Sequence, residues 1–141
     1  MKNFRNKSVL IIDDDIRMLR ALKKVLAGEG CTVNCVTWVV DAVEFLTERK
    51  MQFDLVITDL RLPFVTGITG VYAIHKMLPQ LPIIVLTAFG SPDVEAECLR
   101  QGARAFLEKP LDITHLLGVI EEIFPAPTFE RGEPAKLEAF P

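Results

Sequence analysis

The stretch Val9-Leu10-Ile11-Ile12-Asp13-Asp14-Asp15 joins four consecutive apolar residues to three consecutive carboxylates. A short, continuous apolar run is typical of a strand buried on both faces, as in a parallel sheet. In open α/β sheets, ligands bind at the carboxyl edge, where such a strand ends. Three adjacent carboxylates repel one another, and a divalent cation would relieve that repulsion. Taken alone, however, the triplet fits a strand end followed by a helix cap better than a metal site.

The composition predicts one soluble globular domain. The chain has 141 residues, of which half are hydrophobic and a quarter charged. The net charge of −3, with no cluster of Lys and Arg, argues against direct contact with nucleic acid. No segment has the length and flanks of a signal peptide or of a membrane span. The three cysteines, Cys31, Cys35 and Cys98, form no disulfide pattern, so we expect buried thiols and a cytoplasmic protein without membrane contact.

The periodicity of the chain predicts five strands that alternate with five helices. The predicted strands are residues 8–13, 31–36, 53–59, 82–87 and 104–107. Such alternation gives an α/β fold, with a parallel sheet, right-handed crossovers and helices on both faces. We assign this domain to residues 1–124. Residues 125–141 contain four prolines and no periodicity, so we expect a poorly ordered tail or linker there.

Capping residues and apolar spacing define the predicted helices. Asp15 is the expected N-cap of the first helix, and Ser91 followed by Pro92 is the expected start of the fourth. The second helix is expected at about 40–50 and the fifth at about 112–124. The residues predicted to face the core are Leu19, Leu22 and Leu26; Val43, Leu46 and a neighbour; Val71, Ile74 and Leu78; and Leu116, Leu117, Ile120 and Ile123 or Phe124.

The predicted strand ends carry groups that suit phosphate chemistry. Asp13 and Asp14 end the first strand and Asp59 ends the third, while Thr87 and Lys109 end the fourth and fifth. Neighbouring strands lie about 4.8 Å apart, so these side chains converge if the strands adjoin. Three carboxylates, a hydroxyl and an ammonium suit Mg²⁺ together with a phosphoryl group, and one carboxylate is placed to attack phosphorus itself.

With these motifs, residues 7–124 resemble the receiver domains of two-component response regulators. The matching stretches are Leu10–Asp15, Asp54–Pro63 with Gly67, Val85–Ala88 and Gly102–Pro110. The resemblance implies a flavodoxin-like (βα)5 fold with five parallel strands in the order 2-1-3-4-5. It also implies a phosphorylation-activated switch, which catalyses only its own phosphoryl transfer and autodephosphorylation.

The resemblance further implies an acceptor and a set of metal ligands. Asp59 would accept the phosphoryl group from a phosphohistidine of a sensor histidine kinase or a phosphotransfer protein. Asp14 and Asp59 would coordinate Mg²⁺ directly, and Asp13 would contribute through water. The backbone carbonyl of Arg61 would be a further ligand.

The remaining matching residues would transmit the signal. Thr87 would bind the phosphoryl oxygens, and Lys109 would pair with the phosphate beside a cis Lys109–Pro110 bond. The ring of Phe106 would turn inward as Thr87 moves. The surface formed by the fourth helix, fifth strand and fifth helix would then change for partner binding or homodimerisation. The sequence names neither the kinase nor the output domain or partner, and both a stand-alone receiver and a fragment of a larger regulator are compatible with it.

Four features depart from the family pattern. Thr66 replaces the acidic residue that often precedes the loop glycine, with little expected effect. The segment Trp38–Val40 is apolar, so it either covers the edge of the core or forms a partner contact. Gly70 should weaken the third helix by about 1 kcal/mol. Arg61 and Phe89 occupy the positions that flank the hydrolytic water in this family, and the bulk of Phe89 predicts slow autodephosphorylation.

Two other functions share part of this pattern. A haloacid-dehalogenase-like phosphatase also places Asp13-x-Asp15 after an apolar strand, but it needs a late acidic pair and a cap insertion that the sequence does not show. A flavin-binding electron carrier needs a Gly/Ser/Thr-rich phosphate loop where this chain has three carboxylates. The phosphatase is therefore the main alternative to the receiver domain.

Overall fold

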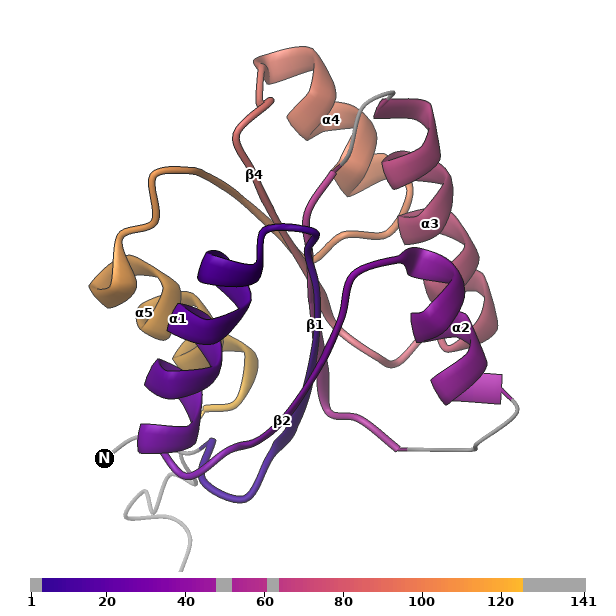
Figure 1. The fold of residues 1–141 in the computed structure, drawn as a ribbon. Helices are drawn as coiled ribbons and strands as arrows, with labels where there is room; N and C mark the ends of the chain where they lie inside the picture. Colours follow the sequence, from indigo (N-terminus) through magenta and orange to yellow (C-terminus); the bar gives the residue numbers. More distant parts are fainter. Residues whose placement is uncertain (1–3, 48–51, 61–63, 126–141) are drawn as a thin grey trace, which may run out of the picture.

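The structure is a computed structural model that describes residues 4–47, 52–60 and 64–125, with the side chains of residues 64–66 left out of the description (Figure 1). Its centre is a parallel sheet of five strands in the order β2-β1-β3-β4-β5. The strands are β1 (Ser8–Ile12), β2 (Thr32–Val36), β3 (Leu55–Thr58), β4 (Ile83–Thr87) and β5 (Ala105–Glu108). This topology confirms the predicted α/β class and strand order.

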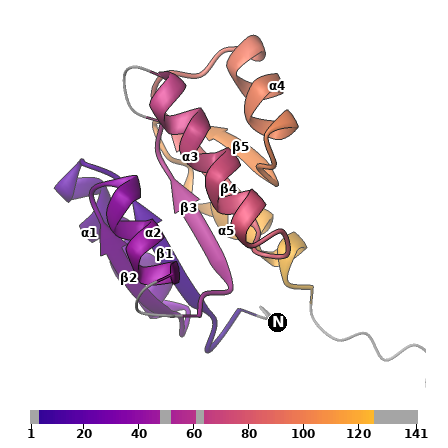
Figure 2. The same cartoon turned by 90° about the vertical axis from the view of Figure 1, so that its right-hand side faces the viewer.

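Helices cover both faces of the sheet. They are α1 (Ile16–Gly28), α2 (Val39–Thr47), α3 (Phe64–Met77), α4 (Pro92–Arg100) and α5 (Ile113–Ile123). Figure 1 shows α1 and α5 on one face and α2, α3 and α4 on the other. Figure 2, turned by 90°, shows α3 lying along the sheet between α2 and α4. None of the helices within the described residues has both the length and the apolar character that crossing a membrane requires.

The alternation of side chains along each strand divides the core into two clusters. Val9 and Ile11 of β1 face the cluster under α1 and α5, whereas Leu10 and Ile12 face the cluster under α2, α3 and α4. Because both faces are covered, β1 is continuously apolar from Val9 to Ile12 rather than alternating with polar residues. Phe4, which lies before the first predicted element, is also fully buried in the first cluster.

The predicted helix caps are confirmed. The Asp15 side chain accepts hydrogen bonds from the backbone amides of Arg17 and Met18, at 3.0 and 3.3 Å. Ser91 accepts one from the amide of Val94 at 3.2 Å, with Pro92 as the first helical residue. Each cap satisfies backbone donors that the first helical turn leaves unpaired.

Some predicted core residues are placed differently. In α2 the buried residue is Ala42, and Leu46 is half-buried against the same core cluster as predicted, whereas Val43 is half-buried and outside that cluster. Leu78 lies beyond the end of α3 and is 36% exposed, because the helix ends at Met77. At α5 the predicted core face is confirmed: Leu116 and Ile120 are buried, and Leu117, Ile123 and Phe124 are half-buried and pack against the same cluster. Of the cysteines, Cys31 and Cys98 are buried and Cys35 is half-buried; all three are free thiols.

Gly70 has a packing role that its helix propensity does not reveal. A Cβ atom built on Gly70 would lie 3.0 Å from both methyl groups of Val39, so the glycine lets α3 approach α2 closely. Val39 packs against the core, whereas its neighbours Trp38 and Val40 are 56% and 71% exposed. The apolar segment Trp38–Val40 therefore covers the core mainly through its central residue.

We predict that Gly70→Ala lowers the free energy of unfolding by about 1 kcal/mol. Overpacking costs about 1–3 kcal/mol, and the β-branched Val39 cannot rotate away from the added methyl group. The gain in helix propensity is only about 1 kcal/mol. Urea denaturation should show this loss, and Val39→Ala should abolish it. Gly118→Ala in α5 is the matched control, because a Cβ there meets nothing within 4 Å and should be stabilising. Equal effects at both glycines would contradict the packing role.

Candidate functional site

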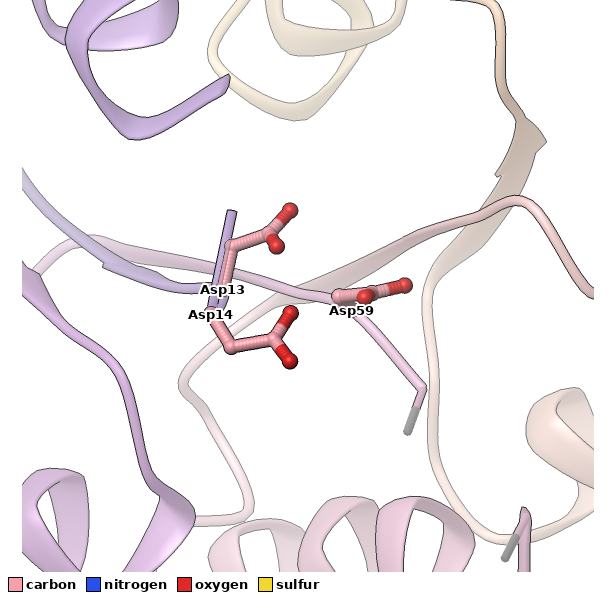
Figure 3. Close-up of side chains that lie close together, drawn as sticks. All are labelled: Asp13, Asp14 and Asp59. Carbon is pink, nitrogen blue, oxygen red and sulfur yellow. The ribbon is translucent and has the colours of Figure 1, made fainter. Parts of the chain in front are cut away.

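Three carboxylates meet at the carboxyl edge of the sheet. Asp13 and Asp14 follow β1, and Asp59 follows β3, which pairs with β1. One oxygen from each of these three side chains lies within 4.8 Å of the others. Figure 3 shows the three carboxylates gathered in one place, with Asp13 and Asp14 reaching it from one stretch of chain. The predicted convergence of the strand ends therefore holds for the acidic residues.

We call Asp13, Asp14 and Asp59 the acidic cluster. Lys109 brings a positive charge to it. Its Nζ atom lies 2.9 Å from Oδ2 of Asp13 and 3.7 Å from Oδ2 of Asp59. The backbone amide of Lys109 donates to the carbonyl of Thr87 at 2.8 Å, which fixes the start of the loop after β5 against the end of β4. The Lys109–Pro110 bond is cis, as the family resemblance implied.

The second oxygen of Asp13 has a partner that the sequence analysis missed. The backbone amide of Asp15 donates to Oδ1 of Asp13 at 2.9 Å, while Oδ2 pairs with Lys109. The signal was available, because Asp side chains commonly accept from the amide two residues later. Both oxygens of this buried carboxylate are thus held in place before any ligand binds.

Burial and neighbouring charges perturb the ionisation of the two central groups. The pKa of Asp59 is raised, first by burial and then by the Asp13 charge, against the smaller lowering effects of Lys109 and Thr87. Burial acts to lower the pKa of Lys109, but its hydrogen bond to Asp13 and the nearby carboxylates outweigh burial and raise it. The site therefore favours an ionised lysine and resists a fully ionised acidic cluster.

The same residues fit a divalent cation. Oδ1 of Asp59 is buried and has no hydrogen-bond partner among the described residues. A buried carboxylate oxygen of this kind is costly unless it binds a donor or a cation. Three oxygen ligands with one compensating ammonium suit a hard ion such as Mg²⁺. The carbonyl of Arg61, the fourth predicted ligand, lies outside the described residues.

Thr87 and Phe106 lie on the neighbouring strands β4 and β5. Thr87 is fully buried at the end of β4, and its Oγ1 accepts a hydrogen bond from the Phe89 amide at 3.1 Å. Phe106 is half-buried in β5, opposite Val85, and packs against the cluster under α2, α3 and α4. Phe89 itself is 43% exposed in the loop after β4. Arg61 and the side chain of Thr66, which depart from the family pattern, lie outside the part of the chain that the structure describes.

We expect the stability of the metal-free protein to fall as pH rises through the raised pKa of Asp59. The folded state binds this proton more tightly than the unfolded chain, so stabilisation is present at low pH and is lost between the ordinary carboxyl pKa and the raised one. Chemical denaturation of wild type and Asp59→Asn across pH 3–8 in EDTA isolates the effect. As the pH rises, the free energy of unfolding of the variant should increase relative to that of the wild type. A difference that stays constant with pH would contradict the raised pKa of Asp59.

The sequence comparisons agree on one family. Residues 9–121 match the family model of the response regulator receiver domain. The transcriptional regulatory protein ZraR of Escherichia coli K12 is 33% identical over 117 residues, which cover 83% of this chain and 26% of ZraR. This chain thus spans about a quarter of the length of that relative.

The comparisons of structure agree with those of sequence. The structure of a response regulator receiver domain protein from Clostridium thermocellum has a TM-score of 0.75 at 26% identity, covering 94% of this chain and 98% of that one. The beryllofluoride-activated NtrC4 receiver domain dimer has a TM-score of 0.75 at 26% identity, covering 83% of this chain and 95% of that one.

Proposed function

This chain belongs to the response regulator receiver domain family, and from that premise we propose that it is a signalling switch whose phosphoacceptor is Asp59. The observation that carries the proposal is the environment of the Asp59 carboxylate. Asp59 is only 8% exposed, it lies beside two other carboxylates and an ammonium, and one of its oxygens has no hydrogen-bond partner among the described residues. A purely structural aspartate at a strand end would be expected to satisfy both oxygens.

The proposed reaction is transfer of a phosphoryl group from a phosphohistidine to Asp59. An oxygen of Asp59 attacks phosphorus, the bond between phosphorus and the histidine nitrogen breaks, and the imidazole leaves with the electron pair. Lys109 would neutralise charge on the phosphoryl oxygens, and Thr87 would donate a hydrogen bond to one of them. Bound Mg²⁺, held by Asp13, Asp14 and Asp59, would supply further neutralisation of those oxygens. The only turnover proposed for this chain is its own phosphorylation and dephosphorylation.

Phosphorylation is proposed to change the face formed by α4, β5 and α5. Oγ1 of Thr87 accepts from the Phe89 amide in this structure, so an inward shift of Thr87 would strain or break that bond. The half-buried ring of Phe106, on the strand next to β4, is placed to follow such a shift. A phosphoryl group brings about two negative charges and strong acceptors, which is enough to bias a two-state surface. The dimeric NtrC4 receiver domain suggests homodimerisation as one use of this face.

The proposed partners are a histidine kinase or phosphotransfer protein upstream and a separate output downstream. ZraR is named a transcriptional regulatory protein and is about four times as long as its matching region. We infer that this chain, too, acts with an output domain or protein, in the cytoplasm, while its net charge of −3 gives no support for direct DNA contact. The direct test of the proposal is the intact mass after incubation with Mg²⁺ and a small acyl phosphate, where one added phosphoryl group is expected.

We predict that Phe89→Glu shortens the lifetime of the phosphorylated protein by about tenfold. Phe89 lies two residues beyond Thr87, and an apolar ring there can obstruct water without orienting it. A carboxylate can accept a hydrogen bond from the attacking water, and general-base assistance typically contributes about 10²-fold or more when well placed. The measurement is the decay of the phosphorylated mass after donor removal, with Phe89→Leu as the apolar control. A lifetime that lengthens in Phe89→Glu would contradict the obstruction.

A further inference from the structure

A cavity lies at the amino edge of the sheet, opposite the acidic cluster. It has a volume of about 650 Å³, within the range of ligand pockets. Phe53 and Pro82, which line it, precede β3 and β4, so they lie at the edge where those strands begin. Leu46, Leu78, Leu81 and Phe124 supply most of the remaining apolar wall. We call this cavity the amino-edge pocket.

The floor of the amino-edge pocket belongs to the core, but its rim is open. Leu81 is buried, and Phe53 and Leu46 pack against the cluster under α2, α3 and α4. Phe124 packs against the other cluster, so the pocket lies where the two cores approach each other. Leu78 is 36% exposed on the rim and belongs to neither cluster. An apolar side chain placed here would extend both cores.

We propose that the amino-edge pocket binds the chain's own segment 126–141. Phe124 is the C-cap of α5 and also lines the pocket, so the segment begins beside its proposed binding site. The segment carries three large apolar side chains, Phe129, Leu137 and Phe140. Phe129 follows Phe124 by five residues, a distance of at most about 18 Å of extended chain, which makes it the first candidate to enter.

Tethering and charge favour this occupant over a separate molecule. A short covalent connection gives an effective concentration in the millimolar range, so a weak apolar contact suffices for docking. Asp54 lines the pocket, and its Oδ2 accepts a hydrogen bond from the Ser8 amide at 2.7 Å. Arg131 follows Phe129 by two residues and can bring a positive charge to that carboxylate. A separate partner would have to compete with a segment that is covalently attached beside the pocket.

Hydrogen exchange on the full chain tests the proposal. We expect the combined variant Phe129→Ser, Leu137→Ser and Phe140→Ser to exchange backbone amides around Phe53 and at Gln80–Leu81 about tenfold faster than the wild type. Thr128→Ser is the matched control and should exchange at the wild-type rate. Unchanged rates in the combined variant would overturn the proposal, and so would protection that is lost on dilution, since a second copy would then be the occupant.

A variant on the pocket side gives an independent readout. Leu78→Ser removes a rim side chain outside both core clusters, so we expect the domain to stay folded. Trypsin cleavage after Arg131 and Lys136 should be several-fold faster in this variant, because the segment is released. Lys76→Gln, an exposed change on α3, is the control. Equal cleavage rates in all three proteins would overturn the proposal, whatever the outcome for phosphorylation of Asp59 at the opposite edge.

Discussion

Replacing Asp59 with asparagine is expected to abolish the gain of one phosphoryl group from a small acyl phosphate in the presence of Mg²⁺. The amide is nearly the same size as the carboxylate, so the fold should persist. Its nitrogen is not a nucleophile at neutral pH, and the change also removes one of the three negative charges of the acidic cluster. Intact mass spectrometry measures the result directly, as the phosphorylated fraction of wild type and variant.

Asp93→Asn is the control for this experiment. Asp93 lies in the first turn of α4, away from the acidic cluster, so its variant should gain the phosphoryl group as the wild type does. A phosphorylated Asp59→Asn protein would show that another carboxylate, such as Asp13, can accept the group. If neither wild type nor variant gains mass although Mg²⁺ raises the melting temperature of both, the proposed switch is wrong. Phosphate release from model esters would then test the phosphatase alternative.

The sequence was sufficient for the fold because its signals agree at every level. The apolar run of β1 requires a strand covered on both faces, and the Asp15 and Ser91 caps locate two helix starts to the residue. The errors concern which of several adjacent apolar residues in a helix is buried. In α2, Ala42 is buried and Leu46 packs against the same core cluster, whereas Val43 lies outside it. Periodicity identifies a face of a helix but not how closely that face approaches the next element.

The sequence was sufficient to select the residues that meet in the candidate site, but not to predict the contacts between their side chains. The strand ends identify Asp13, Asp59 and Lys109, since parallel strands of one sheet end at one edge. The sequence could not show that Lys109 pairs more closely with Asp13 than with Asp59. It also could not show that one oxygen of Asp59 is buried without a partner. These facts depend on side-chain positions that several strands and loops determine together.

We expect Lys109→Met to slow phosphorylation of Asp59 by about 10²–10³-fold, the usual effect of removing one preorganised donor that faces developing charge. Methionine keeps the length and the apolar stem of lysine but removes the ammonium that lies 2.9 Å from Asp13 and 3.7 Å from Asp59. The measurement is the rate of mass gain with acyl phosphate at saturating Mg²⁺. Lys76→Met is the control, because this exposed lysine on α3 contacts Tyr72 rather than the acidic cluster.

The affinity for Mg²⁺ separates this role of Lys109 from a merely structural one. In the absence of phosphate, the ammonium competes with a cation for Asp13 and Asp59, so its removal should leave Mg²⁺ binding unchanged or tighten it. Thermal melting against Mg²⁺ concentration reports that affinity, since ligand binding stabilises the folded state. Slower phosphorylation with equal or tighter Mg²⁺ binding is the expected combination. Weaker binding, with a rate that recovers at high Mg²⁺, would instead mean that Lys109 serves only to hold the acidic cluster in place.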